Sequence, residues 1–110
     1  MLTRALLPPA ERQQYSRLRQ ILDRPGLIRG SLVTMGRTCG KESCRCAEAK
    51  SKRHRALYVA VNVDGKRRMI YVPAAWEGRI REWVDRYGQI RTALEKLSRR
   101  CIRRLQSREE

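Results

Sequence analysis

The chain of 110 residues is strongly basic, with 26 Lys or Arg against 11 Asp or Glu and a formal net charge of +15. Its length suits one domain with a modest core, and 41% hydrophobic residues indicate a globular rather than a disordered chain. No apolar run approaches the roughly 20 residues of a membrane-spanning helix, which excludes a membrane-spanning role. Because so much like charge repels itself, we expect a polyanionic partner, and nucleic acid is the leading candidate.

The first residues, Met1 to Pro9, lack the apolar stretch of roughly 7–15 residues that a secretory signal needs. We therefore expect a cytoplasmic, nucleoid-associated protein. In a reducing cytoplasm, the four cysteines are more often metal ligands or buried thiols than disulfides.

The first predicted element is a helix that starts at Pro8-Pro9, because proline is tolerated in the first turn of a helix. It extends to about Arg24, where Pro25-Gly26 stops it. The apolar face of this helix is narrow and consists of Tyr15, Leu18, Ile21 and Leu22.

Three short strands are predicted next. Residues 31–35 are rich in β-formers between two glycines, and apolar residues alternate with others over 56–63. Asp64-Gly65 is typical of a two-residue hairpin turn that leads into a return strand over 66–72. The strands form a small antiparallel meander, so the predicted fold class is α+β.

The loop between the first two strands carries a candidate metal site. Cys39, Cys44, Cys46 and His54 are spaced Cys-x4-Cys-x-Cys-x7-His, and four such ligands suit one structural Zn2+ per chain. The alternatives are an unmetallated thiol cluster, a redox or disulfide pair and, for His54, an ordinary surface residue. Cys101 is interpreted as a small apolar residue outside the site.

Pro73 precedes a long helix predicted from about Ala74 to Gln106. Apolar residues recur along it at alternating spacings of four and three, the pattern of a heptad seam. The seam consists of Trp76, Ile80, Trp83, Tyr87, Ile90, Leu94, Leu97 and Cys101. The face of the first helix is too short to cover all of it, so we expect the seam to dock a protein partner or a second copy. A single domain over 1–110 is predicted, with the N-terminal helix in 1–26, the zinc-loop meander in 27–73 and the long basic helix in 74–110.

Three clusters of basic residues are candidate phosphate contacts: the cysteine loop, the hairpin tip and the end of the last helix. They comprise Lys41, Arg45, Lys50, Lys52, Arg53 and Arg55; Lys66, Arg67 and Arg68; and Arg99, Arg100, Arg103, Arg104 and Arg108. The alternative for the last cluster is an ordinary solvated helix end.

One block of the sequence is distinctive, Cys39-Gly40-Lys41 with Cys44-Arg45-Cys46, and it stands in a fixed order with Gly30-Ser31-Leu32-Val33, His54, Tyr58, Tyr71-Val72-Pro73, Trp83-Val84 and Tyr87. In these residues, over roughly 28–100, the chain resembles a family of small bacterial proteins of unknown function that accompany mobile-element genes. The resemblance implies a link to DNA transposition or recombination, with no catalytic residues.

No catalytic constellation is recognisable, because the chain has a single histidine, no phosphate-binding glycine loop and no nucleophile elbow. We therefore expect a protein that is not an enzyme. The favoured function is that of a DNA-binding accessory subunit of a transposase or recombinase, with duplex DNA favoured over RNA. The alternatives are an RNA-binding or ribosome-associated module and a protein adaptor that docks through the seam.

Overall fold

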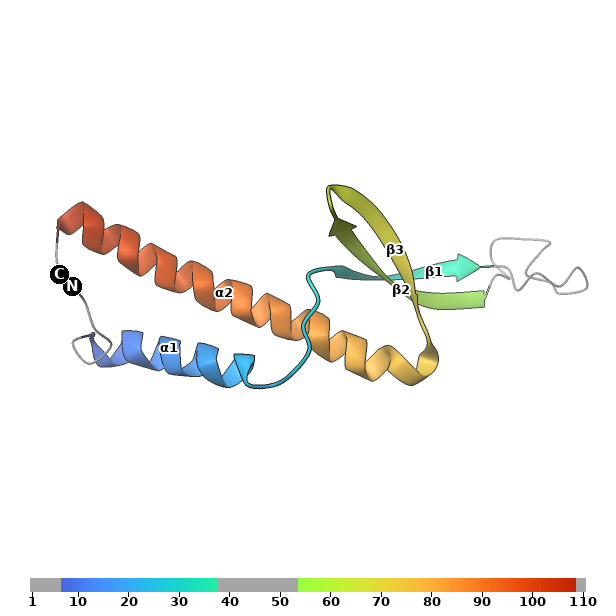
Figure 1. The fold of residues 1–110 in the computed structure, drawn as a ribbon, viewed down its shortest axis with the longest axis horizontal. Coiled ribbons are helices and arrows are strands. Elements are labelled where there is room, and N and C mark those ends of the chain that lie inside the picture. Colours follow the sequence, from blue (N-terminus) through green and yellow to red (C-terminus); the bar gives the residue numbers. More distant parts are fainter. Residues whose placement is uncertain (1–6, 38–53, 109–110) are drawn as a thin grey trace, which may run out of the picture. The chain divides into compact units, whose positions relative to one another are not determined.

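A computed structural model describes residues 7–37 and 54–108 (Figure 1). Its elements in chain order are α1 (Pro9–Leu22), β1 (Ser31–Arg37), β2 (His54–Val63), β3 (Lys66–Val72), the 3-10 turn η4 (Ala74–Trp76) and α2 (Glu77–Ser107). This arrangement confirms the predicted α+β class, with an N-terminal helix, a three-stranded antiparallel sheet and a long C-terminal helix. The predicted zinc loop lies outside the described residues.

The backbone packs into two compact units. We call the described part of Ile28–Val84 the sheet unit, and the described parts of Met1–Leu27 and Asp85–Glu110 the helix-pair unit. α2 contributes its first turns to the sheet unit and the rest of its length to the helix-pair unit. The single-domain organisation expected from the sequence stays a prediction.

The sheet has the strand order β1-β2-β3, with both pairings antiparallel. Asp64 and Gly65 have φ angles of 53° and 77°, the left-handed conformation that a tight two-residue hairpin turn requires. The turn fixes the register, which pairs Val63 with Lys66. The predicted hairpin turn and the return strand over 66–72 are therefore confirmed.

One face of the sheet packs on the start of α2. The core consists of Leu57, Val59, Val72 and Ile80, with Ile28, Leu32, Val61, Trp83 and Val84 packed around it. Every strand residue in this set lies on the same sheet face, as the alternation of side chains along a strand requires. The backbone N–H of Ile28 donates to the carbonyl oxygen of Trp83 at 3.2 Å. This hydrogen bond joins the segment that precedes β1 to the start of α2.

Gly30 precedes β1 where the backbone passes very close to β2. A Cβ at this position would lie 2.8 Å from the carbonyl oxygen of Ala60 and 2.9 Å from a methyl group of Val61. Such distances are shorter than van der Waals contact, so only glycine fits without a shift of the backbone.

In the helix-pair unit, α1 lies alongside the C-terminal part of α2 (Figure 1). Leu7, Ile90 and Leu97 are its buried apolar residues. The guanidinium of Arg86, which is also buried, donates to the carbonyl oxygens of Pro25 at 2.6 Å and of Gly26. These carbonyls follow the end of α1, where no helical N–H can reach them, so Arg86 replaces the missing backbone donors.

α2 is one helix from Glu77 to Ser107 and passes through Gly88 without interruption. It was predicted to begin near Ala74, but the first turn after Pro73 is the 3-10 turn η4 instead. Trp76 closes this turn with its ring edge-to-face against Trp83, and the guanidinium of Arg79 lies 4.3 Å from the centre of the Trp76 ring. In residues 7–37 and 54–108, none of the helices combines the length with the apolar character that a membrane span needs.

Candidate nucleic-acid interface

The hairpin tip is a projecting basic surface. Lys66, Arg67 and Arg68 open β3 and pair with Val63, Asn62 and Val61 of β2. All three basic residues are exposed. Because consecutive strand residues alternate between the two faces, Arg67 lies on the face opposite to Lys66 and Arg68, and the tip presents cations on both sides.

The three strands together carry five Lys or Arg residues and no Asp or Glu. Arg55, which lies near the start of β2, is exposed and belongs to this set. The ion pairs Arg91–Glu95 and Arg104–Glu11 both lie outside the strands. Lys66, Arg67, Arg68 and Arg55 are exposed, so an external anion can reach them.

The end of α2 is the second basic surface. Between Lys96 and Arg108 the sequence holds six basic residues and no acidic one. Arg99, Arg103 and Arg108 are exposed, and Arg100 is half-buried. Cations near a helix C-terminus are favoured by the helix dipole, so part of this enrichment serves the helix itself.

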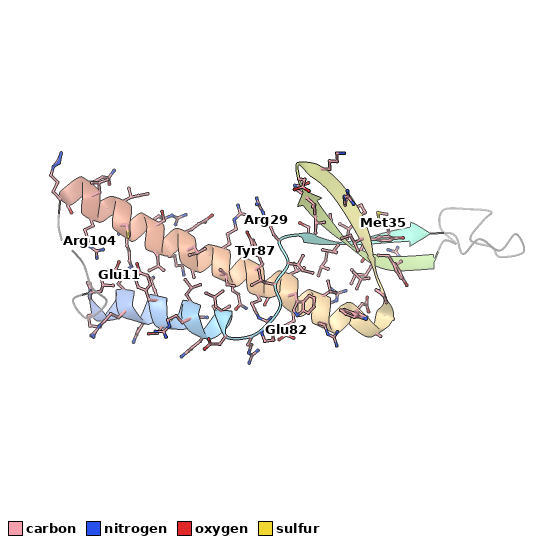
Figure 2. All side chains as sticks on the ribbon, viewed as in Figure 1. Glu11, Arg29, Met35, Glu82, Tyr87 and Arg104 are labelled. Carbon is pink, nitrogen blue, oxygen red and sulfur yellow. The ribbon has the colours of Figure 1, made fainter. Side chains whose placement is uncertain are left out.

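Arg104 differs from its neighbours, because it is paired inside the helix-pair unit. Its two Nη atoms donate to Glu11, with Nη1 3.2 Å from Oε1 and Nη2 2.5 Å from Oε2 (Figure 2). The Glu11 side chain is 0% exposed and that of Arg104 is 16% exposed. A two-pronged pair of this kind satisfies both carboxylate oxygens and leaves little of Arg104 for a phosphate.

The pair also shifts the titration of both groups. The hydrogen bonds from Arg104 hold the pKa of Glu11 below its ordinary value, against the opposing effect of burial. The charges of Arg104 and Arg100 lower that pKa further. In return, the hydrogen bonds to Glu11 raise the pKa of Arg104. Glu11 is therefore ionised at neutral pH and holds Arg104 in place.

The eight seam residues fall into a covered and an uncovered group. Ile80, Ile90 and Leu97 are buried, and Trp83 and Tyr87 are half-buried. Trp76, Leu94 and Cys101 are exposed. At the end of α2 the more covered residues are Ala93, Leu97, Arg100 and Arg104. On a straight helix, residues that repeat every seven positions rotate around the helix axis by about 20° per repeat. Toward the end of α2, the seam residues predicted from the sequence therefore no longer lie on the side of the helix that is covered.

The candidate metal ligands Cys39, Cys44 and Cys46 lie outside the described residues, as do the candidate phosphate contacts Lys41, Arg45, Lys50, Lys52 and Arg53. His54 opens β2, and its backbone pairs with that of Arg37 at the end of β1. The two ends of the cysteine segment are thus held at neighbouring positions of the sheet. Within residues 7–37 and 54–108, no group of three metal-binding side chains is found.

Three features of the structure were not predicted from the sequence. The ion pair of Glu11 with Arg104 and the buried Arg86 are two of them, because pairing across more than 60 residues leaves no local pattern. The third is the pair of rings of Tyr58 and Tyr71, whose centres lie 5.8 Å apart across the two strands. The signal for the two tyrosines was available, because the register that follows from Asp64-Gly65 places them opposite each other.

A family model described as a domain of unknown function (DUF6788) matches residues 9–82. The matched range includes α1 and all three strands and ends before the basic part of α2. Searches of the curated proteins and of the solved structures find no match to the chain. Because the family model spans more than half of the sequence, the chain belongs to the DUF6788 family, a domain of unknown function.

Proposed function

We propose that the protein is a non-catalytic nucleic-acid-binding protein that holds the phosphate backbone of duplex DNA, as an accessory subunit of a transposase or recombinase. The observation that carries the proposal is the sheet, whose strands bear five basic residues and no acidic one. Arg67 and its neighbours project from a tip with cations on both faces, a shape suited to phosphates on either side of a groove.

The end of α2 adds a second basic surface in the proposal. Arg99 and Arg103 are exposed and one helical turn apart, so their like charges repel each other unless an anion lies between them. A phosphate backbone provides such anions at regular spacing. Arg104 has a structural role in this scheme, as the partner of Glu11.

The proposed zinc site would brace the loop that leads into β2. The pairing of Arg37 with His54 supports it, because it brings the chain on both sides of the cysteine segment to one end of the sheet. Three thiolates and one imidazole are a common ligand set for structural zinc. Metal analysis of the purified protein should give one zinc per chain, and Cys44→Ser should abolish that content. Protein free of zinc would contradict this part of the proposal.

Binding to a duplex oligonucleotide over a range of salt concentrations tests the main proposal. We expect log K to fall linearly with log salt, with a slope of about 0.9 per phosphate contacted. Lys66→Gln with Arg67→Gln should weaken binding and reduce the slope. Arg81→Gln with Arg91→Gln removes the same charge from exposed positions of α2 outside the proposed surfaces and is the matched control. A flat salt response, or equal losses in both variants, would contradict the proposal.

Competition between duplex DNA and structured RNA in one gel-shift series separates the DNA function from an RNA-binding or ribosome-associated one. We expect duplex DNA to displace bound RNA at a lower competitor concentration than RNA needs to displace bound duplex DNA.

Imaging of the tagged protein in bacterial cells tests its location. It should place the protein in the cytoplasm, over the nucleoid.

A second candidate function is protein docking through α2. It is favoured by Leu94, Ile102 and Leu105, which leave an apolar strip exposed on that helix. Leu94→Gln with Leu105→Gln should then abolish assembly with the partner, or with a second copy, and leave binding to DNA intact. Sedimentation of the wild-type chain and of this variant, each with and without DNA, checks that expectation.

A further inference from the structure

The sheet has a second face that the core does not use. It carries Val33 and Met35 from β1, Ala56, Tyr58 and Ala60 from β2, and Arg67, Met69 and Tyr71 from β3. These residues alternate along the strands with those that pack on α2. We call them the tyrosine face.

Large side chains on the tyrosine face are open to solvent. Tyr71 is 47% exposed, Met35 and Met69 are each more than one-third exposed, and Tyr58 is half-buried. Figure 2 labels Met35 on β1. Ala56 and Ala60 flank Tyr58 on this face along β2, whereas Tyr71 lies on β3 beside Met69. Two tyrosine rings that reach solvent are groups on which flat apolar molecules can stack.

The ring geometry allows stacking by a separate flat group. The rings of Tyr58 and Tyr71 meet at 66°, edge toward face, and are not stacked face to face on each other. The exposed part of the Tyr71 side chain can receive a nucleobase, and stacking of this kind contributes about 1–3 kcal/mol per base.

Charge decides which flat molecule fits the tyrosine face. Arg67 lies on this face at the hairpin tip, and the strands carry a net charge of five with no acidic residue. A second copy of this chain would bring the same positive charge against it. A polyanion with aromatic bases matches both the rings and the cations.

The dimensions favour unpaired bases over a duplex. Three strands about 4.8 Å apart place the outer strand axes about 10 Å from each other before side chains are added. The major groove of B-DNA is only about 12 Å wide and admits two strands, not three. Bases inside a duplex also have no free ring face, whereas unpaired bases can lie flat on a sheet.

We infer that the tyrosine face binds single-stranded nucleic acid, with bases stacked on Tyr58 and Tyr71 and the backbone held by Arg67. This inference rests on the proposed nucleic-acid-binding function and adds a second substrate form to it.

The test uses the full chain with labelled oligo(dT) and oligo(U) of about 15 nucleotides, long enough for one binding face, and a duplex of the same length. Tyr71→Leu should weaken binding to the single strands about 5- to 100-fold and leave duplex binding and the salt slope unchanged. Tyr71→Phe keeps the ring and is the matched control, which should bind like the wild type. Comparison of oligo(dT) with oligo(U) tells whether the strand is DNA or RNA.

Photocross-linking gives a readout that does not depend on a variant. An oligonucleotide that contains iodouracil should cross-link to the wild-type protein at Tyr58 or Tyr71, as located by mass spectrometry of the digested adduct. Equal single-strand binding by Tyr71→Leu and wild type, or cross-links only outside the tyrosine face, would overturn the inference while duplex binding persists. Loss of binding to every nucleic acid tested would overturn the proposed function as well.

Discussion

The sheet unit and the helix-pair unit are stabilised in different ways. The sheet unit has an aliphatic core, in which Leu57 and Val59 pack with residues of α2. The helix-pair unit has few buried apolar residues and depends on two charged side chains, Glu11 and Arg86, that are buried with their hydrogen-bond partners. The stabilisation from buried apolar area does not depend on pH, and it constrains the core mainly through the volume that the side chains fill. The stabilisation from a buried ion pair depends on the protonation of both groups and requires one relative orientation of them.

The largest expected loss of stability comes from a substitution that removes volume from the core of the sheet unit. Leu57 is 6% exposed, and Leu57→Ala should lower the free energy of unfolding by about 2–4 kcal/mol. Leu94, at 52% exposed, offers the same change outside any core, so Leu94→Ala should cost less than about 0.5 kcal/mol. Urea denaturation of both variants measures the difference, and equal costs would contradict the assignment of the core.

A smaller effect is expected from Glu11→Gln, which separates the two units by their response to pH. Because the pKa of Glu11 is lowered on folding, its contribution is fully present above the ordinary value of 4.5 and is lost as pH falls through the lowered one. The variant should be less stable than the wild type at neutral pH, and the two should converge in acid.

Thermal unfolding followed by helical circular dichroism, from neutral pH down to about pH 2, measures this convergence. Glu95→Gln is the control, because Glu95 forms only an exposed i,i+4 pair with Arg91. A stability difference between wild type and Glu11→Gln that stays constant at low pH would show that the ion pair is not the source.

Gly30→Ala is expected to cost about 1–3 kcal/mol, because the new Cβ would press on the carbonyl oxygen of Ala60 and the backbone would have to move. The loss should appear in the sheet unit, as faster amide hydrogen exchange in β1 and β2. Unchanged exchange in these strands would mean that the close approach at Gly30 is relaxed in solution.

The smallest expected change is an increase in stability, from Gly88→Ala. A Cβ at Gly88 would meet open space, and Gly88 lies inside α2. Gly88→Ala should therefore stabilise the protein by up to about 1 kcal/mol, since alanine loses less backbone freedom in a helix. A rise in the melting temperature checks it. A fall would indicate that a bound partner or a second copy needs the bare backbone at this position.

Sequence patterns were most informative where the signal is local. The alternation over 56–63 and the pair Asp64-Gly65 were enough to predict the hairpin and its register, and both are confirmed. The heptad pattern predicted a long helix correctly, but it did not show that Leu94 would be exposed and Ala93 half-covered. The spacing of apolar residues shows which side of a helix is apolar. Which side is buried depends on the segments of the chain that pack against the helix.

The candidate site was predictable only in part, because charge counting treats all basic residues alike. Arg103 and Arg104 are neighbours in one basic run, yet the first is exposed and the second is bound to Glu11 from the other end of the chain. Only tertiary structure separates them. The assignment of the cysteines to zinc stays a prediction that metal analysis tests.

The order of synthesis gives the ion pair of Glu11 with Arg104 a further meaning. The two residues are 93 positions apart, and along the sequence the residues of the sheet unit come between α1 and the part of α2 that pairs with it. During synthesis on the ribosome, α1 emerges first and the end of α2 emerges last. The sheet can therefore fold before α1 has a helix to pair with. The apolar side of α1 is then exposed for as long as translation takes to reach Arg104. The narrow apolar face of α1 and its three arginines, Arg12, Arg17 and Arg19, limit the apolar surface that this segment exposes before it pairs.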